Sequence, residues 1–80
     1  MSLEKFKNYK SILQEATQSK LKKIPHYKVL QEEGLEHDKV FTISVSMNGD
    51  VLGIGQGKNK KDAQQNAAKE GYRTFCKMDI

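Results

Sequence analysis

Apolar residues recur at helical spacing near the start of the chain. The stripe is formed by Tyr9, Ile12, Leu13 and Ala16, with Phe6 extending it backwards. The positions i, i+3, i+4 and i+7 lie on one face of an α-helix, so the pattern predicts a helix over residues 4–20. Glu4 and Asn8 are both candidates for its first turn or cap. Pro25 ends this region because it biases Ile24 toward extended geometry.

The middle of the chain changes from helical spacing to alternation. Residues 39–47 place Phe41, Ile43, Val45 and Met47 on one face and Thr42, Ser44 and Ser46 on the other, which predicts a strand with one wet side. Asn48-Gly49 is a strong two-residue hairpin signal, so the chain should return as a strand over residues 51–56. Residues 26–32 alternate weakly and form the first strand, with a loop at residues 34–38.

The last third returns to helical spacing. Small and apolar side chains recur every four residues at Ala63, Ala67, Gly71 and Phe75, while Lys61, Gln65, Lys69 and Arg73 form a polar ridge. The predicted fold class is therefore α+β in the order α-β-β-β-α, a three-stranded antiparallel sheet with both helices packed on its apolar face. We expect one domain over residues 1–80, with a core at about 7–76 and a leader at 1–3.

Composition narrows the possible functions only moderately. The 80 residues are 36 % hydrophobic without Trp, and 14 basic against 10 acidic residues give a net charge of +4. The distribution of this charge therefore matters more than its total. A single cysteine, Cys76, excludes an internal disulfide and suits a reducing compartment. No apolar run has the length of a signal or membrane helix, so we expect a cytoplasmic protein without a membrane partner.

The basic residues gather where the second helix begins. Asn59 is a favourable N-cap, and Asp62 is favoured at the third helical position by the helix dipole. Lys58, Lys60 and Lys61 surround the unpaired amides of the first turn, which together form an anion site without a metal or catalytic group. The plainer interpretation is an ordinary amphipathic helix with solvated lysines.

The glycines before Lys58 also raise the possibility of a nucleotide P-loop. The pattern G-x-x-x-x-G-K-[ST] requires glycine at position 52 and Ser or Thr at position 59, where this chain has Leu52 and Asn59. The chain is also too short for the usual α/β nucleotide domain. A P-loop is therefore excluded.

Two further surfaces offer neutral or acidic polar groups. Ser11, Gln14 and Glu15 lie on one face of the first helix and can exchange hydrogen bonds with sugar hydroxyls, although a plain solvated face has the same composition. His37 lies in the loop between two acidic residues and can hydrogen-bond a neutral hydroxyl, or it is simply exposed. Two histidines and a distant Cys76 give no metal-ligand spacing, and no nucleophile–base pair indicates an enzyme.

These residues, taken in order, resemble the double-stranded RNA-binding domain (dsRBD) family over roughly residues 7–75. The shared signatures are Pro25-x-Tyr27, Gly34-x-x-His37-x-x-x-Phe41, Asn48-Gly49 and Gly55-x-Gly57-Lys58-x-Lys60-Lys61-x-Ala63-x-x-x-Ala67-Ala68. The segment from Tyr9 to Gln18 looks more narrowly like the module at the carboxyl end of bacterial ribonuclease III. Leu35, Glu36, Asn59 and the Gly71-Tyr72 pair depart from the family pattern without removing a contact residue. We expect Gly71 to weaken the second helix by up to about 1 kcal/mol.

The resemblance implies that the chain binds double-stranded RNA by its A-form shape. The first helix and the loop at residues 34–38 would enter successive minor grooves, and the lysines would hold phosphates across the major groove between them. The candidate RNA-binding residues are Ser11, Gln14, Glu15, His37, Lys58, Asn59, Lys60 and Lys61.

The resemblance also implies a non-catalytic fragment that needs no cofactor. A parent ribonuclease III would use Mg²⁺, and form a homodimer, through a separate catalytic domain. The alternative is a protein-interaction module of the same fold, in which the sheet face or the second helix mediates dimerisation.

Overall fold

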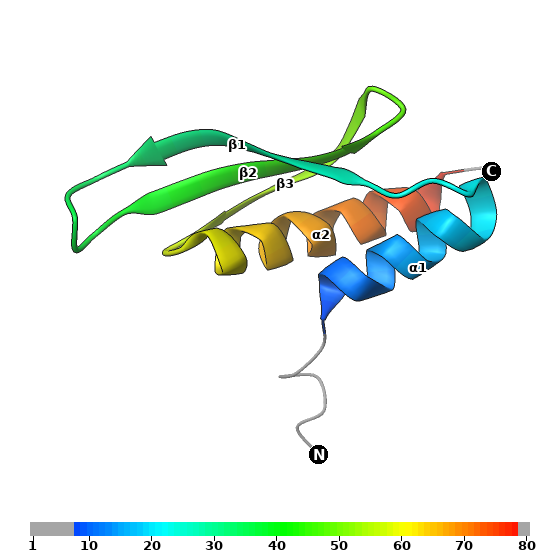
Figure 1. Ribbon diagram of the computed structural model, residues 1–80, viewed down its shortest axis with the longest axis horizontal. Coiled ribbons are helices and arrows are strands. Elements are labelled where there is room, and N and C mark those ends of the chain that lie inside the picture. The colour runs from blue at the N-terminus through cyan, green and yellow to red at the C-terminus, as the bar shows by residue number, and fades with distance from the viewer. Residues whose placement is uncertain (1–7, 79–80) are drawn as a thin grey trace, which may run out of the picture.

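The computed structural model describes residues 8–78, and its elements follow the predicted order (Figure 1). They are α1 (Tyr9–Leu21), β1 (His26–Glu33), β2 (Val40–Met47), β3 (Asp50–Gly57) and α2 (Lys60–Lys77). The predicted α-β-β-β-α fold class is confirmed. The expected leader at residues 1–3 and the first part of the predicted helix, residues 4–7, lie outside the described residues.

Helix α1 begins and ends with two distinct caps. Asn8, one of the two candidate caps, accepts a hydrogen bond from the amide of Ser11 through its side-chain oxygen at 3.2 Å. At the other end, Lys22 adopts the left-handed conformation (φ 58°, ψ 31°), and its amide donates to the carbonyl of Gln18 at 3.0 Å. Glycine is the usual residue at this kind of helix end, and a residue with a side chain costs roughly 1–2 kcal/mol there.

The sheet is antiparallel with the strand order β1-β2-β3. Asn48 (φ 56°) and Gly49 (φ 85°) form the predicted hairpin, and both have the positive φ that a two-residue turn of this hand requires. The register shifts in β3 between the partners of Val45 and Ser46, which leaves Leu52 as an extra residue. Leu52 is 5 % exposed, so this bulge turns one more apolar side chain into the core.

Both helices lie on the same side of the sheet, as predicted, but they are not equivalent (Figure 1). Helix α2 lies directly on β3 and β2, whereas α1 packs chiefly against α2. The predicted ridge of α2 is buried, and Phe75 is the largest fully buried side chain of the core. The position of α1 is therefore set by α2.

Helix α2 and strand β3 approach each other at backbone distance. A Cβ atom added to Gly55 would lie 2.1 Å from the amide nitrogen of Ala67, and one added to Gly53 would lie 2.4 Å from the amide nitrogen of Gly71. Gly57 has the same relation to Ala63, at 2.5 Å. Alternate residues of a strand share one face, so the three glycines leave the face of β3 that meets α2 without side chains. Helix α2 can therefore pack against the backbone of the strand.

One expectation from the sequence needs correction, and another gains a structural reason. Ser44, predicted on the wet face, is only 5 % exposed because it lies on the central strand between Lys28 and Ile54 of the neighbouring strands. Gly71, which we expect to lower the helix propensity of α2, also provides packing space, because an added Cβ would lie 2.7 Å from Cγ1 of the buried Val45.

Candidate nucleic-acid interface

The start of α2 has the geometry of an anion site. Asn59 is extended (φ −144°, ψ 169°), and its side-chain oxygen accepts a hydrogen bond from the amide of Asp62 at 2.8 Å. Its carbonyl accepts from the amide of Ala63 at 3.0 Å. The amides of Lys60 and Lys61 have no acceptor within residues 8–78 and point out of the helix end. Lys58, Lys60 and Lys61 are all exposed around them.

Asn59 is predicted both to cap α2 and to contact RNA, and both roles would use its one side chain. Its oxygen caps the helix, and its amide nitrogen lies 3.3 Å from a carboxylate oxygen of Asp62. The direct contribution of Asn59 is therefore to shape the turn that carries the lysines.

The polar face of α1 lies beside this site. Ser11, Gln14 and Glu15 are exposed, and together with Gln18 they line an open hollow of about 180 Å³. A second hollow, of about 460 Å³, is lined by residues of both helices, namely Asn8, Lys10, Ser11, Gln14, Lys61 and Gln65. The structure thus brings the predicted residues Ser11 and Gln14 together with Lys61 at one surface.

Gln65 joins the two helices. Its side-chain oxygen accepts a hydrogen bond from the amide of Tyr9 at 2.8 Å, and its side-chain nitrogen donates to the cap oxygen of Asn8 at 3.0 Å. Two hydrogen bonds in opposite directions fix both the separation and the rotation of the start of α1. The sequence places Gln65 only on a polar ridge, and no local signal reveals a partner more than fifty positions away.

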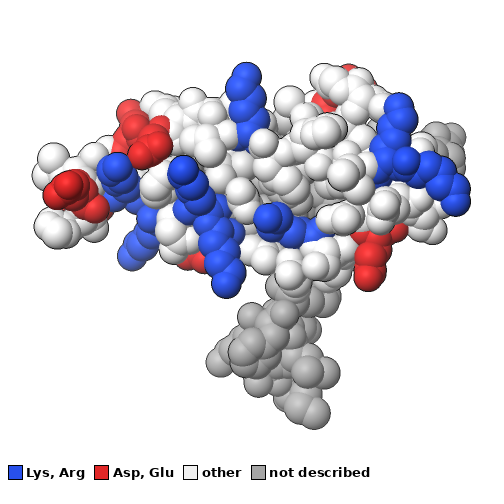
Figure 2. Space-filling model, in the orientation of Figure 1, with Lys and Arg blue, Asp and Glu red and all other residues white. Residues whose placement is uncertain are grey.

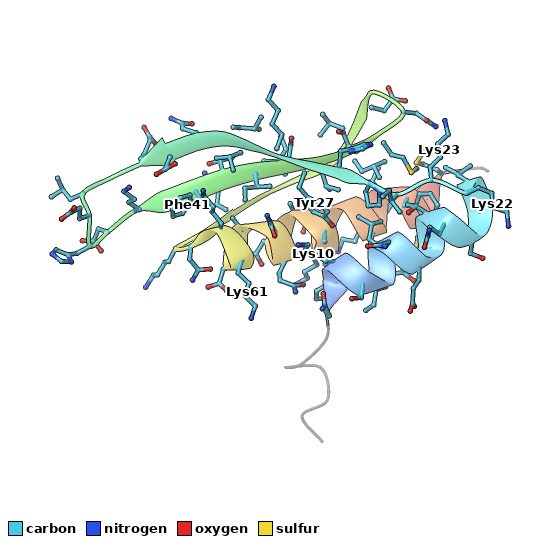
Figure 3. All side chains as sticks on the ribbon, in the orientation of Figure 1. Lys10, Lys22, Lys23, Tyr27, Phe41 and Lys61 are labelled. Carbon is cyan, nitrogen blue, oxygen red and sulfur yellow. The ribbon has the colours of Figure 1, made fainter. Side chains whose placement is uncertain are left out.

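Lys10 forms a second link that the sequence analysis missed. Its ammonium donates to the side-chain oxygen of Gln64 at 2.7 Å and lies 5.2 Å from the centroid of the Tyr27 ring (Figure 3). The phenol oxygen of Tyr27 is buried without a hydrogen-bond partner among the described residues, and this burial raises the pKa of Tyr27 to about 12. Lys10 therefore connects α1 to both α2 and the sheet.

The loop with His37 lies at the same end of the molecule as the start of α2 (Figure 1), and it does not line either hollow beside α1. The loop is held by a hydrogen bond from the amide of Asp38 to the carbonyl of Leu35 at 2.9 Å and by a Lys39–Glu32 ion pair at 3.1 Å. His37 is exposed, and Leu35 is 80 % exposed. The loop thus presents an imidazole and an apolar side chain to solvent.

Basic side chains gather at two places on the face shown in Figure 2. In Figure 2, lysine and arginine side chains gather at the left of this face, and a second group lies at its right end. Among residues 8–78, no three His, Cys, Asp or Glu side chains are grouped so that they could hold a metal ion. No helix of the described part is long and apolar enough to cross a membrane.

Comparison with known proteins identifies the family to which this chain is similar. The family model described as double-stranded RNA binding motif matches residues 9–74. Ribonuclease 3 of Treponema denticola is 46 % identical over 69 residues, which are 86 % of this chain and 28 % of that protein. Ribonuclease 3 of Chlorobaculum tepidum is 53 % identical over 73 residues, which are 91 % of this chain and 27 % of that protein.

A solved structure is also similar to this chain. The solution structure of DRB4 dsRBD2 superimposes with a TM-score of 0.63 at 32 % identity, covering 88 % of this chain and 97 % of that one. The chain spans little more than a quarter of the length of the ribonuclease relatives. The match nevertheless extends across both helices and all three strands. The chain belongs to the double-stranded RNA-binding motif family.

Proposed function

We propose that this domain binds double-stranded RNA by shape and serves as the RNA-binding module of a ribonuclease III. The observation that carries the proposal is the shared hollow in which Ser11 and Gln14 of α1 meet Lys61 of α2. One surface thus offers groups suited to hydroxyls beside groups suited to phosphates. Double-stranded RNA presents both, because its wide minor groove displays 2′-hydroxyls between two phosphate backbones.

In this proposal, three elements contact one duplex. Helix α1 enters a minor groove through Ser11, Gln14 and Glu15, and the loop with His37 enters the next minor groove. The lysines at the start of α2 hold phosphates across the major groove between them. Asn59 keeps the amides of Lys60 and Lys61 free to face the same phosphates.

The alternative of an interaction-only module receives less support from the surface. The sheet face opposite the helices exposes Val40, Val51 and Ile54, but Thr42, Ser46 and Gln56 lie around them. Scattered apolar side chains of this kind are normal on a monomer. An interaction-only module would also have no need of three exposed lysines around a helix start.

The discriminating test uses Glu15, because a carboxylate beside a polyanion is useful only if it accepts hydrogen bonds from hydroxyls. We expect Glu15→Ala to weaken RNA binding several-fold, since a hydrogen bond contributes about 0.5–1.5 kcal/mol net. The slope of log K against log salt should stay almost unchanged. Titrations against an RNA duplex and a B-form DNA duplex of equal length measure both quantities.

Glu70→Ala is the matched control, because it removes one exposed acidic charge from the second half of the other helix, α2. If Glu15 is merely solvated, both variants should tighten RNA binding by removing repulsion. Equal affinity of the unchanged domain for RNA and DNA would contradict the proposal itself.

A second expected result concerns catalysis. Incubated with Mg²⁺ and a long RNA duplex, the domain should leave the RNA intact, because cleavage with Mg²⁺ requires clustered carboxylates to position the ion. Gel analysis of the RNA over time, with an active ribonuclease as positive control, measures this. Cleavage that co-purifies with the folded domain and disappears on its unfolding would show that the module is itself an enzyme.

A further inference from the structure

The polar face of α1 continues beyond Glu15 into another hollow. Gln18 lines the hollow beside Ser11, Gln14 and Glu15, and it also lines an open hollow of about 540 Å³ at the far end of the helix. That second hollow lies between the end of α1, the start of β1 and the β2–β3 hairpin. We name it the basic hollow, after Lys22, Lys23 and His26 in its wall.

The cations of the basic hollow are available to a ligand. Lys22 and Lys23 are exposed, and neither forms an ion pair within residues 8–78. The ammonium of Lys23 donates to the side-chain oxygen of Asn48 at 2.6 Å, which ties the end of α1 to the hairpin. An ammonium has three donors, so two remain for an anion. The same group of charges is visible at the right end of Figure 2.

The backbone of Lys22 gives a second, independent indication. Its φ of 58° is a conformation that glycine adopts freely and that a lysine adopts only with strain. The amide of Lys22 completes the helix cap, but any residue supplies that amide. The cap explains the left-handed backbone but not the lysine side chain, because glycine would serve the cap at this position with less strain.

We propose that the basic hollow holds a backbone phosphate of the RNA duplex whose minor groove α1 enters, as a fourth contact region. This inference rests on the proposed function. A helix rises 1.5 Å per residue, so Lys22 lies about 16 Å beyond Ser11 along the axis. A helix lying across a groove meets a phosphate backbone at its edge, and Gln18 lines both the hollow beside Glu15 and the basic hollow, so the two adjoin along α1.

The sharpest test is Lys22→Gly, because it removes the charge and relieves the strain together. RNA affinity should fall, and the slope of log K against log salt should decrease by about 1. The melting temperature should equal or exceed that of the parent. Lys28→Gln is the matched control, since it removes one exposed charge on the opposite sheet face and should leave the slope unchanged.

Lys23→Gln provides a second variant that leaves the strained backbone alone and should also decrease the slope by about 1. An unchanged slope in both variants, while Lys60→Gln still lowers it, would overturn the fourth contact and leave the proposed function standing. Absence of RNA binding by the parent domain would instead overturn the proposed function and this inference with it.

Free inorganic phosphate distinguishes an RNA contact from a small-anion site. Phosphate titrated into the RNA-free domain should shift the amide resonances of Lys22, Lys23 and Asn48 only weakly, because a single phosphate lacks the other three contact regions. Saturable phosphate binding that Lys22→Gly abolishes, together with an unchanged RNA slope, would assign the hollow to a small anion and overturn the proposal.

Discussion

Replacing Gly55 by alanine is expected to lower the free energy of unfolding by about 3 kcal/mol or more. The new Cβ would lie 2.1 Å from the nitrogen of Ala67, 2.5 Å from the carbonyl carbon of Asn66 and 2.8 Å from the carbonyl oxygen of Ala63. All three atoms are backbone, so no side chain can rotate away and α2 must move off the sheet. Overpacking commonly costs about 1–3 kcal/mol and occasionally more, and a rigid clash of this kind belongs at the upper end.

The measurement is urea unfolding followed by circular dichroism. A domain of this size has a free energy of unfolding of about 4–12 kcal/mol, so a loss of about 3 kcal/mol or more is large. Gly49→Ala is the control, because Gly49 has positive φ (85°) but no heavy atom within 4 Å of an added Cβ. The Gly49→Ala variant should lose only roughly 1–2 kcal/mol of unfolding free energy, which is the cost of a left-handed backbone for a residue with a side chain. Equal stability of Gly55→Ala and the parent would show that α2 does not lie directly on β3.

Neutralising Lys58, Lys60 and Lys61 together should weaken RNA binding about 500-fold at 0.1 M salt. Each phosphate contact contributes about 0.9 to the slope of log K against log salt, so three contacts contribute about 2.7 per decade of salt. Over the one decade from 1 M to 0.1 M salt, a slope of about 2.7 corresponds to a change in the binding constant of about 500-fold. Folding should be unaffected, because all three side chains are exposed and the Asn59 cap is retained.

Glutamine at Lys28, Lys69 and Lys77 gives a variant with the same net charge and should lose far less affinity. Binding of both variants is measured at several salt concentrations, on two RNA duplexes of unrelated sequence. Because phosphates carry no sequence information, the loss should be the same on both duplexes. An equal loss in the control variant would mean that net charge, rather than the site at the start of α2, attracts the RNA.

The sequence predicted the elements well where local chemistry decides them. Asn48-Gly49 and the Asn59 cap are short-range signals, and the structure contains both as expected. The buried ridge of α2 was also predicted, because small and apolar side chains that recur every four residues lie on one face of a helix. The order of the elements and their assignment to one side of the sheet follow from these signals.

What the sequence could not predict depends on contacts between distant segments. The extra residue Leu52 depends on register between two strands, and alternation alone gives no register shift. The burial of Ser44 depends on its neighbours in other strands. The close fit of α2 on Gly53, Gly55 and Gly57 depends on the placement of α2 against β3, which no local pattern gives. Gln65 and Lys10 have partners more than fifty residues away, so no local pattern marks them.

The two hydrogen bonds between Gln65 and the start of α1 have one more consequence. They hold α1 at a set distance from the lysines of α2, and in the proposed function this distance would make the domain a gauge of the spacing between grooves and phosphates. A gauge responds to the period of a duplex and is indifferent to its base sequence. Recognition should then weaken wherever a bulge changes that period, even where every phosphate and 2′-hydroxyl is present.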